Sequence, residues 1–204
     1  MKAELVVATK NKKKLEEIKE ILKIKDLKIT SLADYPGSPR IIENGKTFKE
    51  NAVKKAVKIA RFTAKLTLGE DSGLCVDILR GKPGIYSSRF AGRNKNDLSN
   101  NLKLLKILEG IPVKKRRAHY CCAVALADKE GLVGVVEGEC SGLIGSALKG
   151  RFGFGYDPLF MIPEYKKTFA QLGPKTKHKM SHRFRALFKA KKKIRDYLKK
   201  RSIF

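Results

Sequence analysis

The sequence contains no long hydrophobic run and no cysteine pair with C-x-x-C spacing. Its first apolar stretch, Leu5 to Ala8, is shorter than the core of a secretory signal and far shorter than a membrane span. We therefore expect a cytoplasmic protein without a membrane anchor. The cysteines follow no disulfide framework, so we expect buried, reduced thiols. They are Cys75, Cys121, Cys122 and Cys140.

Acidic residues are also scarce. The chain has 20 Asp and Glu against 46 Lys and Arg, a formal net charge of +26. The excess is concentrated between Pro174 and Phe204, where thirteen basic residues accompany one acid, Asp196, for a net +12. Such a segment can bind nucleic acid through phosphate contacts. It can also be the solvated face of a helix in a cell with high internal salt, which we favour.

The hydrophobic pattern predicts a single domain, residues 1–204, because 204 residues with 42% hydrophobic composition can bury one substantial core. Predicted strands cover residues 5–9, 27–32, 119–127 and 131–143. Predicted helices begin after Asn11, at 47–65, at 98–108 and at about 181. The last two strands are joined by a short turn and should form a long hairpin. This order predicts a mixed α/β fold.

A loop between the first predicted strand and helix is the first candidate site. Its residues, Thr9 to Lys14, include several lysines. A helix N-terminus presents backbone N–H groups and a favourable dipole to an anion, so the loop can bind phosphate. It lacks the glycines of a Walker loop, which excludes a P-loop nucleotidase. The alternative is an ordinary capped helix with lysines in solvent.

Five carboxylates stand out because acids are rare in this chain. Carboxylates beside phosphate-binding lysines favour a hard cation, since Mg²⁺ takes oxygen ligands and shares substrate phosphates. They could instead form surface ion pairs or cap helices, and Glu70 to Gly73 is also a plausible turn. The five are Glu43, Glu50, Glu70, Asp71 and Asp77.

Two later segments are candidates for contact with a base. The glycines between Gly153 and Pro158 permit backbone turns, and the aromatic residues among them can stack on a base. Ser181-His182-Arg183 stands at the expected start of the last helix. A tight turn with Phe154 in the core, together with a structural histidine, would explain the same residues without a ligand.

Six segments, in this order and at this spacing, resemble the inosine triphosphate pyrophosphatase family, also called the Ham1 family. The resemblance extends over almost the whole chain. The segments are A-T-K-N-K-K-K-L-E-E at 8–17, E-N-G-K-T-F-K-E-N-A at 43–52, E-D-S-G-L-C-V-D at 70–77, P-G-I-Y-S-S-R-F-A-G at 83–92, G-F-G-Y-D-P-L-F at 153–160 and S-H-R-F-R-A at 181–186.

The resemblance implies an elongated mixed β-sheet flanked by helices, two lobes around a nucleotide-binding cleft, and a homodimer. It also implies hydrolysis of non-canonical purine nucleoside triphosphates (ITP, dITP and XTP) to the monophosphate and pyrophosphate, which cleanses the nucleotide pool. The implied cofactor is Mg²⁺, for which Mn²⁺ can substitute because both accept oxygen ligands.

The resemblance further assigns roles to individual residues. Asp71 matches the proton acceptor, and the metal-ligand positions are matched by Glu43, Asp71 and Glu70. Substrate-binding positions are matched by Thr9, Asn11, Lys14, Lys55, Ser72, Phe154, Gly155, Tyr156, Asp157, Lys177, His182 and Arg183. Donors from His182 and Arg183 would suit the 6-carbonyl of hypoxanthine or xanthine, which adenine lacks.

Two departures from the family pattern bear on these roles. Glu70 stands where many relatives have Asp, which affects only its role as a direct metal ligand, and Lys10 replaces a frequent glycine. Two other functions remain as alternatives. A nucleic-acid-binding protein would use the basic C-terminal helix in a salt-sensitive way without nucleotide turnover. A pyrophosphatase of the related Maf type would act on pyrimidine or modified nucleotides, but the S-H-R segment favours the purine family.

Overall fold

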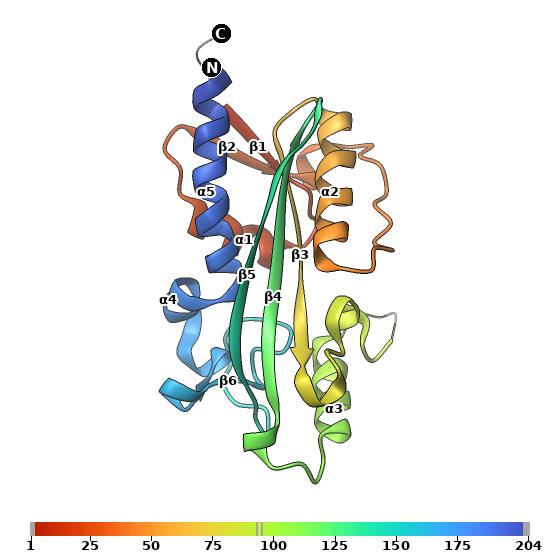
Figure 1. The fold of residues 1–204 in the computed structure, drawn as a ribbon, viewed down its shortest axis with the longest axis vertical. Helices are drawn as coiled ribbons and strands as arrows, with labels where there is room; N and C mark the ends of the chain where they lie inside the picture. The colour runs from red at the N-terminus through yellow and green to blue at the C-terminus, as the bar shows by residue number, and fades with distance from the viewer. Residues whose placement is uncertain (1–2, 93, 95, 202–204) are drawn as a thin grey trace. The chain divides into compact units, whose positions relative to one another are not determined.

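The computed structural model describes residues 3–92, 94 and 96–201 (Figure 1). The strands are β1 Ala3–Val7, β2 Leu27–Ser31, β3 Thr67–Val76, β4 Arg117–Asp128, β5 Gly131–Ile144, β6 Phe160–Ile162 and β7 Lys167–Thr168. The helices are α1 Lys12–Leu22, α2 Phe48–Thr63, α3 Asp97–Ile107, α4 Phe169–Met180 and α5 His182–Arg201. Short 3-10 helices are η1 Leu32–Asp34, η2 Asp77–Leu79, η3 Gly84–Arg89, η4 Val113–Lys115 and η5 Pro163–Tyr165.

Within the described residues, the strands form one mixed sheet of seven, in the order β2-β1-β3-β4-β5-β6-β7. β1 pairs in parallel with β2 and β3, with Leu5 opposite Ile29 and Val6 opposite Thr67. β6 pairs antiparallel with β5 and β7. β4 and β5 are neighbours joined by a two-residue turn, so they form the predicted hairpin. The predicted mixed α/β fold is therefore confirmed.

The chain divides into two compact units, each built from separate stretches of sequence. The first unit comprises Met1–Asp71, Cys122–Gly138 and Arg183–Phe204. The second comprises Ser72–Cys121 and Glu139–His182. The chain passes from one to the other within β3, β4 and β5 and directly after His182, the first residue of α5. The number of units equals the number of lobes that the family resemblance implies. The assignment of residues 1–204 to a single domain stays a prediction.

The core of the first unit lies on both faces of β4, because successive strand residues point to opposite sides. Figure 1 shows α1 and α5 on one side of β4 and α2 on the other. On the first side, Cys122, Val124 and Leu126 pack among apolar residues of α1 and α5. On the other side, the small side chains of Ala123, Ala125 and Ala127 pack against Ala52, Ala56 and Ala60 of α2. Small residues at this contact allow α2 to approach the sheet closely.

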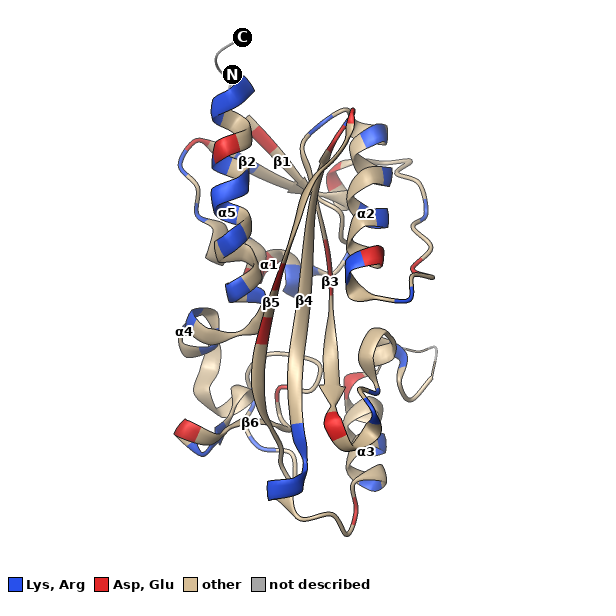
Figure 2. Ribbon diagram, in the orientation of Figure 1, with Lys and Arg blue, Asp and Glu red and all other residues tan. Residues whose placement is uncertain are grey.

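Helix α5 confirms the predicted basic C-terminal helix and shows an amphipathic pattern. Its buried positions recur with helical spacing at Ala186, Leu187, Ala190 and Ile194. Lysine and arginine residues make up much of the rest of the helix (Figure 2). One side of α5 therefore packs against the core, and the basic residues on its other side are solvated. Among the described residues, no helix combines the length and apolarity needed to cross a membrane.

The second unit has its own core, formed where β3, β4, β5 and β6 meet α3 and α4. Its largest members are aromatic, with Tyr120 and Phe160 at a ring-centroid distance of 4.7 Å and Phe160 and Phe169 at 5.1 Å. Leu74, Leu104 and Leu108 are completely buried beside them. The core therefore holds together elements that are far apart in the sequence.

The structure adds elements that the sequence did not predict. β3 continues through Glu70 to Gly73, so the turn allowed by these residues does not form. Nearly every side chain of this strand is buried, which favours continued pairing over a solvated turn. β6, β7 and η3 were missed because their apolar runs are short. α4 was missed because Gly173 and Pro174 interrupt it, and Gly173 has non-helical dihedral angles.

The prediction of four buried, reduced thiols is only partly correct. All four cysteines, which lie in the described part of the chain, are outside disulfides, and Cys122 and Cys140 are buried. Cys75 and Cys121, however, are only partly buried. For Cys121 the reason is the alternation of β4, which turns its side chain to the face opposite that of its buried neighbours Tyr120 and Cys122.

Candidate active site

The lysine loop between β1 and α1 is ordered by its own side chains. The Asn11 side chain accepts a hydrogen bond from the backbone N–H of Lys14 at 3.1 Å, which confirms the predicted N-cap. Thr9 Oγ1 accepts one from the N–H of Asn11, also at 3.1 Å. The loop thereby directs Lys14 towards β3, where its Nζ lies 2.8 Å from Glu70 Oε2. The sequence separates Lys14 and Glu70 widely, and the fold brings them together.

Lys55 forms a second cationic centre in the first unit. Its Nζ lies 2.7 Å from Glu43 Oε2 and 3.0 Å from Asp71 Oδ1, and it donates to the Glu70 carbonyl at 3.1 Å. Burial works to lower the pKa of Lys55, but the carboxylates of Asp71 and Glu43 outweigh it and raise that pKa. Lys55 is therefore held in its charged form by the two carboxylates beside it.

Asp71 is buried and held in a fixed orientation. Asn51 Nδ2 donates to its Oδ2 at 3.1 Å, while Asn51 Oδ1 accepts from the backbone N–H of Gly45 at 2.8 Å. Burial raises the pKa of Asp71, and the positive charges of Lys55 and Lys14 offset this only in part. A raised pKa makes the carboxylate a stronger proton acceptor. Sequence reasoning gave Asn51 no role, although it lies in the quoted segment 43–52.

Gly69 on β3 sets how closely α2 approaches the acidic residues. A Cβ on Gly69 would lie 2.2 Å from the Ala52 carbonyl oxygen and 2.6 Å from the Ala56 nitrogen. Both are backbone atoms of α2, so they cannot move aside as a flexible side chain could. Glycine at this position therefore allows Asn51 and Lys55 of α2 to reach Asp71.

We expect Gly69→Ala to lower both stability and activity. The added methyl group must displace α2, and overpacking of this kind costs about 1–3 kcal/mol of the free energy of unfolding. Denaturant unfolding and nucleotide turnover measure the two effects. Gly134→Ala is the matched control, because a Cβ there would meet only the flexible Lys193 side chain, at 3.3 Å or more. Equal effects of the two substitutions would contradict the role given to Gly69.

Arg183, at the start of α5, is fully buried in the first unit. Its guanidinium binds the carboxylate of Glu17 and lies 3.0 Å from Glu70 Oε1. Burial opposes its charge, but Glu70 and Glu17 outweigh burial and raise the pKa of Arg183. The Cys122 thiol also donates to Glu70 Oε1, at 3.4 Å. Glu70 thus binds Lys14 and Arg183, whereas Glu43 and Asp71 bind Lys55. The sequence analysis had not assigned Glu17 any role.

The glycine-rich turn of the second unit is organised around Asp157. Its Oδ2 accepts from the Phe154 N–H at 2.9 Å and from Lys177 Nζ at 2.7 Å. Gly153 has φ of 81°, and a Cβ there would lie 2.0 Å from Asp157 Oδ2, so only glycine fits. Lys177 Nζ lies 4.8 Å from the centre of the Phe154 ring. The structure therefore joins three residues that were predicted to bind substrate.

Other predicted residues of the second unit have structural partners. Tyr156 is buried in the core and donates to the Ser87 carbonyl at 2.8 Å. The His182 ring stacks on Tyr120 at 4.5 Å. From α3, Asp97 accepts from the Gly155 N–H and Asn101 donates to the Gly155 carbonyl, both at 2.8 Å. These two α3 contacts had no signal in the sequence.

The structure thus divides the predicted residues between the two units. The first unit contains Thr9, Asn11, Lys14, Glu43, Lys55, Glu70, Asp71 and Arg183. The second contains Ser72, Phe154, Gly155, Tyr156, Asp157, Lys177 and His182. Ser72 follows Asp71 directly on β3 and is partly buried. In the first unit the acids and bases form two adjoining groups, one centred on Glu70 and one on Lys55.

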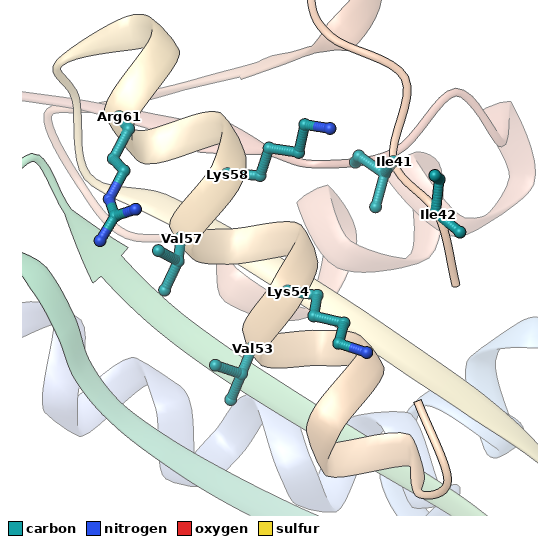
Figure 3. Close-up of a pocket in the computed structure, with 7 residues that line it drawn as sticks. All are labelled: Ile41, Ile42, Val53, Lys54, Val57, Lys58 and Arg61. Atoms are coloured by element: carbon teal, nitrogen blue, oxygen red, sulfur yellow. The ribbon is translucent and has the colours of Figure 1, made fainter. Parts of the chain in front are cut away.

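A separate groove of about 590 Å³ lies beside α2 in the first unit (Figure 3). Lys58 closes part of it by donating to the Arg40 carbonyl at 2.7 Å. None of its lining residues is among those predicted to bind substrate or metal. They are Ile41, Ile42, Val53, Lys54, Val57, Lys58 and Arg61. The groove is therefore distinct from the carboxylate and lysine groups described above.

Comparison with known proteins gives the same family over almost the whole chain. The sequence pattern of the Ham1 family matches residues 5–193. A dITP/XTP pyrophosphatase of Desulforamulus reducens is 50% identical over 91% of this chain and 92% of its own length. One of Shouchella clausii is 47% identical over 94% and 96%. The structure of a HAM1 protein from Coxiella burnetii superposes with a TM-score of 0.86 at 35% identity, covering 95% and 99%.

Proposed function

The chain belongs to the Ham1 family, and we propose that it hydrolyses non-canonical purine nucleoside triphosphates (dITP, ITP and XTP) to the monophosphate and pyrophosphate. One observation carries the proposal: two lysines and three carboxylates converge in the first unit. They are Lys14, Lys55, Glu43, Glu70 and Asp71. The relatives named dITP/XTP pyrophosphatases support the substrate class. We place the enzyme in the cytoplasm, acting on the nucleotide pool as a homodimer.

The carboxylates of Glu43 and Asp71 fit a divalent cation. Each has an oxygen within 3.0 Å of the same ammonium group, that of Lys55, so they converge on one positive charge. Oxygen donors of this kind suit Mg²⁺, and also Mn²⁺. Bound Mg²⁺ would neutralise and polarise the substrate phosphates. Glu70 could join as a ligand only after Lys14 leaves it, because Lys14 and Arg183 occupy its carboxylate.

The residues of the first unit supply the remaining chemistry. Asp71 accepts a proton from the water that attacks the α-phosphate, and Asn51 holds its second oxygen in place. Lys14 and Lys55 offset the negative charge that gathers on the phosphates as pyrophosphate leaves. The Thr9–Asn11 loop adds backbone N–H groups at the start of α1. The chain mainly positions groups and balances charge, as phosphoryl chemistry requires.

We assign selection of the base to the turn at Phe154–Asp157 together with His182 and Arg183. The Phe154 ring offers a stacking surface, and Tyr156 anchors the turn in the core. Donors from His182 and Arg183 suit the 6-carbonyl of hypoxanthine and xanthine, whereas adenine would leave them unpaired at about 1–3 kcal/mol for each buried group. On substrate binding, the ammonium group of Lys177 would leave its ion pair with Asp157 and bind a substrate phosphate. Ser72 would contact the substrate beside Asp71.

We expect ITP hydrolysis to require Mg²⁺ and to release pyrophosphate as the first product. The reason is that the lysines and carboxylates suit attack at the α-phosphate, which makes pyrophosphate the leaving group. A panel of nucleoside triphosphates with separate assays for pyrophosphate and orthophosphate measures this. ATP, which lacks the 6-carbonyl, is the matched control substrate. Orthophosphate as the initial product, or turnover of pyrimidine nucleotides in preference to ITP, would refute the assignment.

A further inference from the structure

A cluster of sulfur and nitrogen ligands lies in the second unit and consists of residues that were given no role above. It consists of Cys75 on β3 and of His119 and Cys121 on β4. One potential ligand atom from each residue lies within 4.8 Å of those of the other two. All three side chains are partly buried, so the cluster is held in place but remains accessible from solvent.

The geometry of the sheet explains why these ligands meet. His119 and Cys121 are two residues apart on β4, so their side chains point to the same face of the strand. The intervening Tyr120 points to the opposite face and packs in the core of the second unit. Cys75 belongs to β3, the neighbouring strand in the sheet. Backbone pairing, with no flexible loop, therefore presents all three ligands on one face.

Carboxylates surround this cluster. Glu139, on the other neighbouring strand β5, places Oε1 3.6 Å from Cys121 Sγ. Asp77 Oδ1 lies 3.5 Å from Nδ1 of His119. A carboxylate next to a metal-binding histidine commonly orients the ring and increases its basicity. The cluster thus has two sulfur donors, one imidazole, a nearby oxygen donor and a carboxylate partner for the histidine.

We propose that Cys75, His119 and Cys121 bind a thiophilic divalent cation of the zinc class, with Glu139 as the fourth ligand. Two thiolates, an imidazole and a carboxylate form a tetrahedral ligand set that Zn²⁺ accepts and that Mg²⁺ does not. In a tetrahedral site, zinc bonds of about 2.3 Å to sulfur and 2.0–2.1 Å to nitrogen place neighbouring ligand atoms about 3.5–4 Å apart. The observed spacing, within 4.8 Å, is about 1 Å wider than this geometry requires.

Binding would cross-link β3, β4 and β5 on one face of the second unit. The thiol protons would be released to solvent as the metal–sulfur bonds form, without any redox change. The site is chemically separate from the carboxylates of the first unit, which offer only oxygen. A metal bound here would therefore stabilise the second unit and take no part in the chemistry proposed for Asp71.

Cobalt titration of the reduced protein, with Mg²⁺ present in excess, tests this proposal. Co²⁺ should bind once per chain and produce a thiolate-to-cobalt charge-transfer band, which carboxylate sites cannot give. Zn²⁺ should displace it and raise the melting temperature. Cys75→Ser, Cys121→Ser and His119→Asn should each weaken binding by at least tenfold while Mg²⁺-dependent turnover is retained. Cys140→Ser, a buried cysteine of the same unit, is the matched control and should bind normally.

Thiol alkylation provides a second measurement that does not depend on the variants folding. Zn²⁺ should protect Cys75 and Cys121 of the unaltered protein from iodoacetamide, as mapped by mass spectrometry. Absence of a charge-transfer band, binding that survives Cys75→Ser and Cys121→Ser, or unprotected thiols would each overturn the proposal. So would a Cys75–Cys121 disulfide that persists in reducing buffer, because it would remove both sulfur ligands. Loss of turnover in these folded variants would overturn the separation of this site from the catalytic chemistry, whereas failure of the unaltered protein to hydrolyse ITP would bear only on the proposed function.

Discussion

Asp71→Asn is expected to lower kcat by about 10²–10⁴-fold, the contribution of a positioned base. The amide preserves the size of the side chain, but it cannot accept the proton of the attacking water and has no charge for a cation. The amide oxygen can still accept a hydrogen bond from Lys55 Nζ, which in the unaltered protein lies 3.0 Å from Asp71 Oδ1. The fold should therefore survive while chemistry is lost. Steady-state ITP turnover and circular dichroism measure the two separately.

The exposed Asp196 on α5 provides the control for this experiment. Asp196→Asn makes the same chemical change far along the chain from β3 and should leave kcat unchanged. If Asp71→Asn retained more than about a tenth of the rate, the base would have to be another group. If it unfolded, Asp71 would be principally the partner that compensates the buried Lys55.

Arg183→Ala is expected to lower the free energy of unfolding by about 3–5 kcal/mol, because it leaves Glu17 and Glu70 in place without their buried cation. This loss would obscure any effect on substrate selection. Arg183→Lys retains the positive charge but not the planar guanidinium, which can serve several acceptors at once. We expect Arg183→Lys to lower kcat/KM for ITP more than for ATP. The difference between the two losses should correspond to at most about 1–3 kcal/mol of transition-state binding.

Arg185, two residues further along α5 and exposed, is the matched control. Arg185→Ala should change neither the unfolding free energy nor the ratio of the two substrates. Equal losses for ITP and ATP in Arg183→Lys would mean that Arg183 acts only by holding Glu70, and through it Lys14. Selection of the base would then rest on Phe154–Asp157 and His182.

Several residues to which we assign the chemistry lie in short motifs that the sequence already showed. Asn11 caps α1 through a contact three residues away, so a local pattern was sufficient to predict it. The basic C-terminal helix was likewise predicted from its local sequence, whereas its buried face, with Ala186, Leu187 and Ala190, was first seen in the structure. The motifs resemble the Ham1 family in order and spacing, which indicated the fold and the carboxylate roles before any distance was known.

Contacts between distant segments were decided only by the tertiary structure, because no local pattern records which strands become neighbours. Only glycine fits at position 69, because a Cβ there would lie 2.2 Å from the Ala52 carbonyl oxygen. This distance depends on where α2 packs. Arg183 reaches Glu17 and Glu70 only because α5 returns to α1 and β3 at the end of the chain. Cys75 and Cys121 look like isolated cysteines until β3 pairs with β4 and places them on one face beside His119.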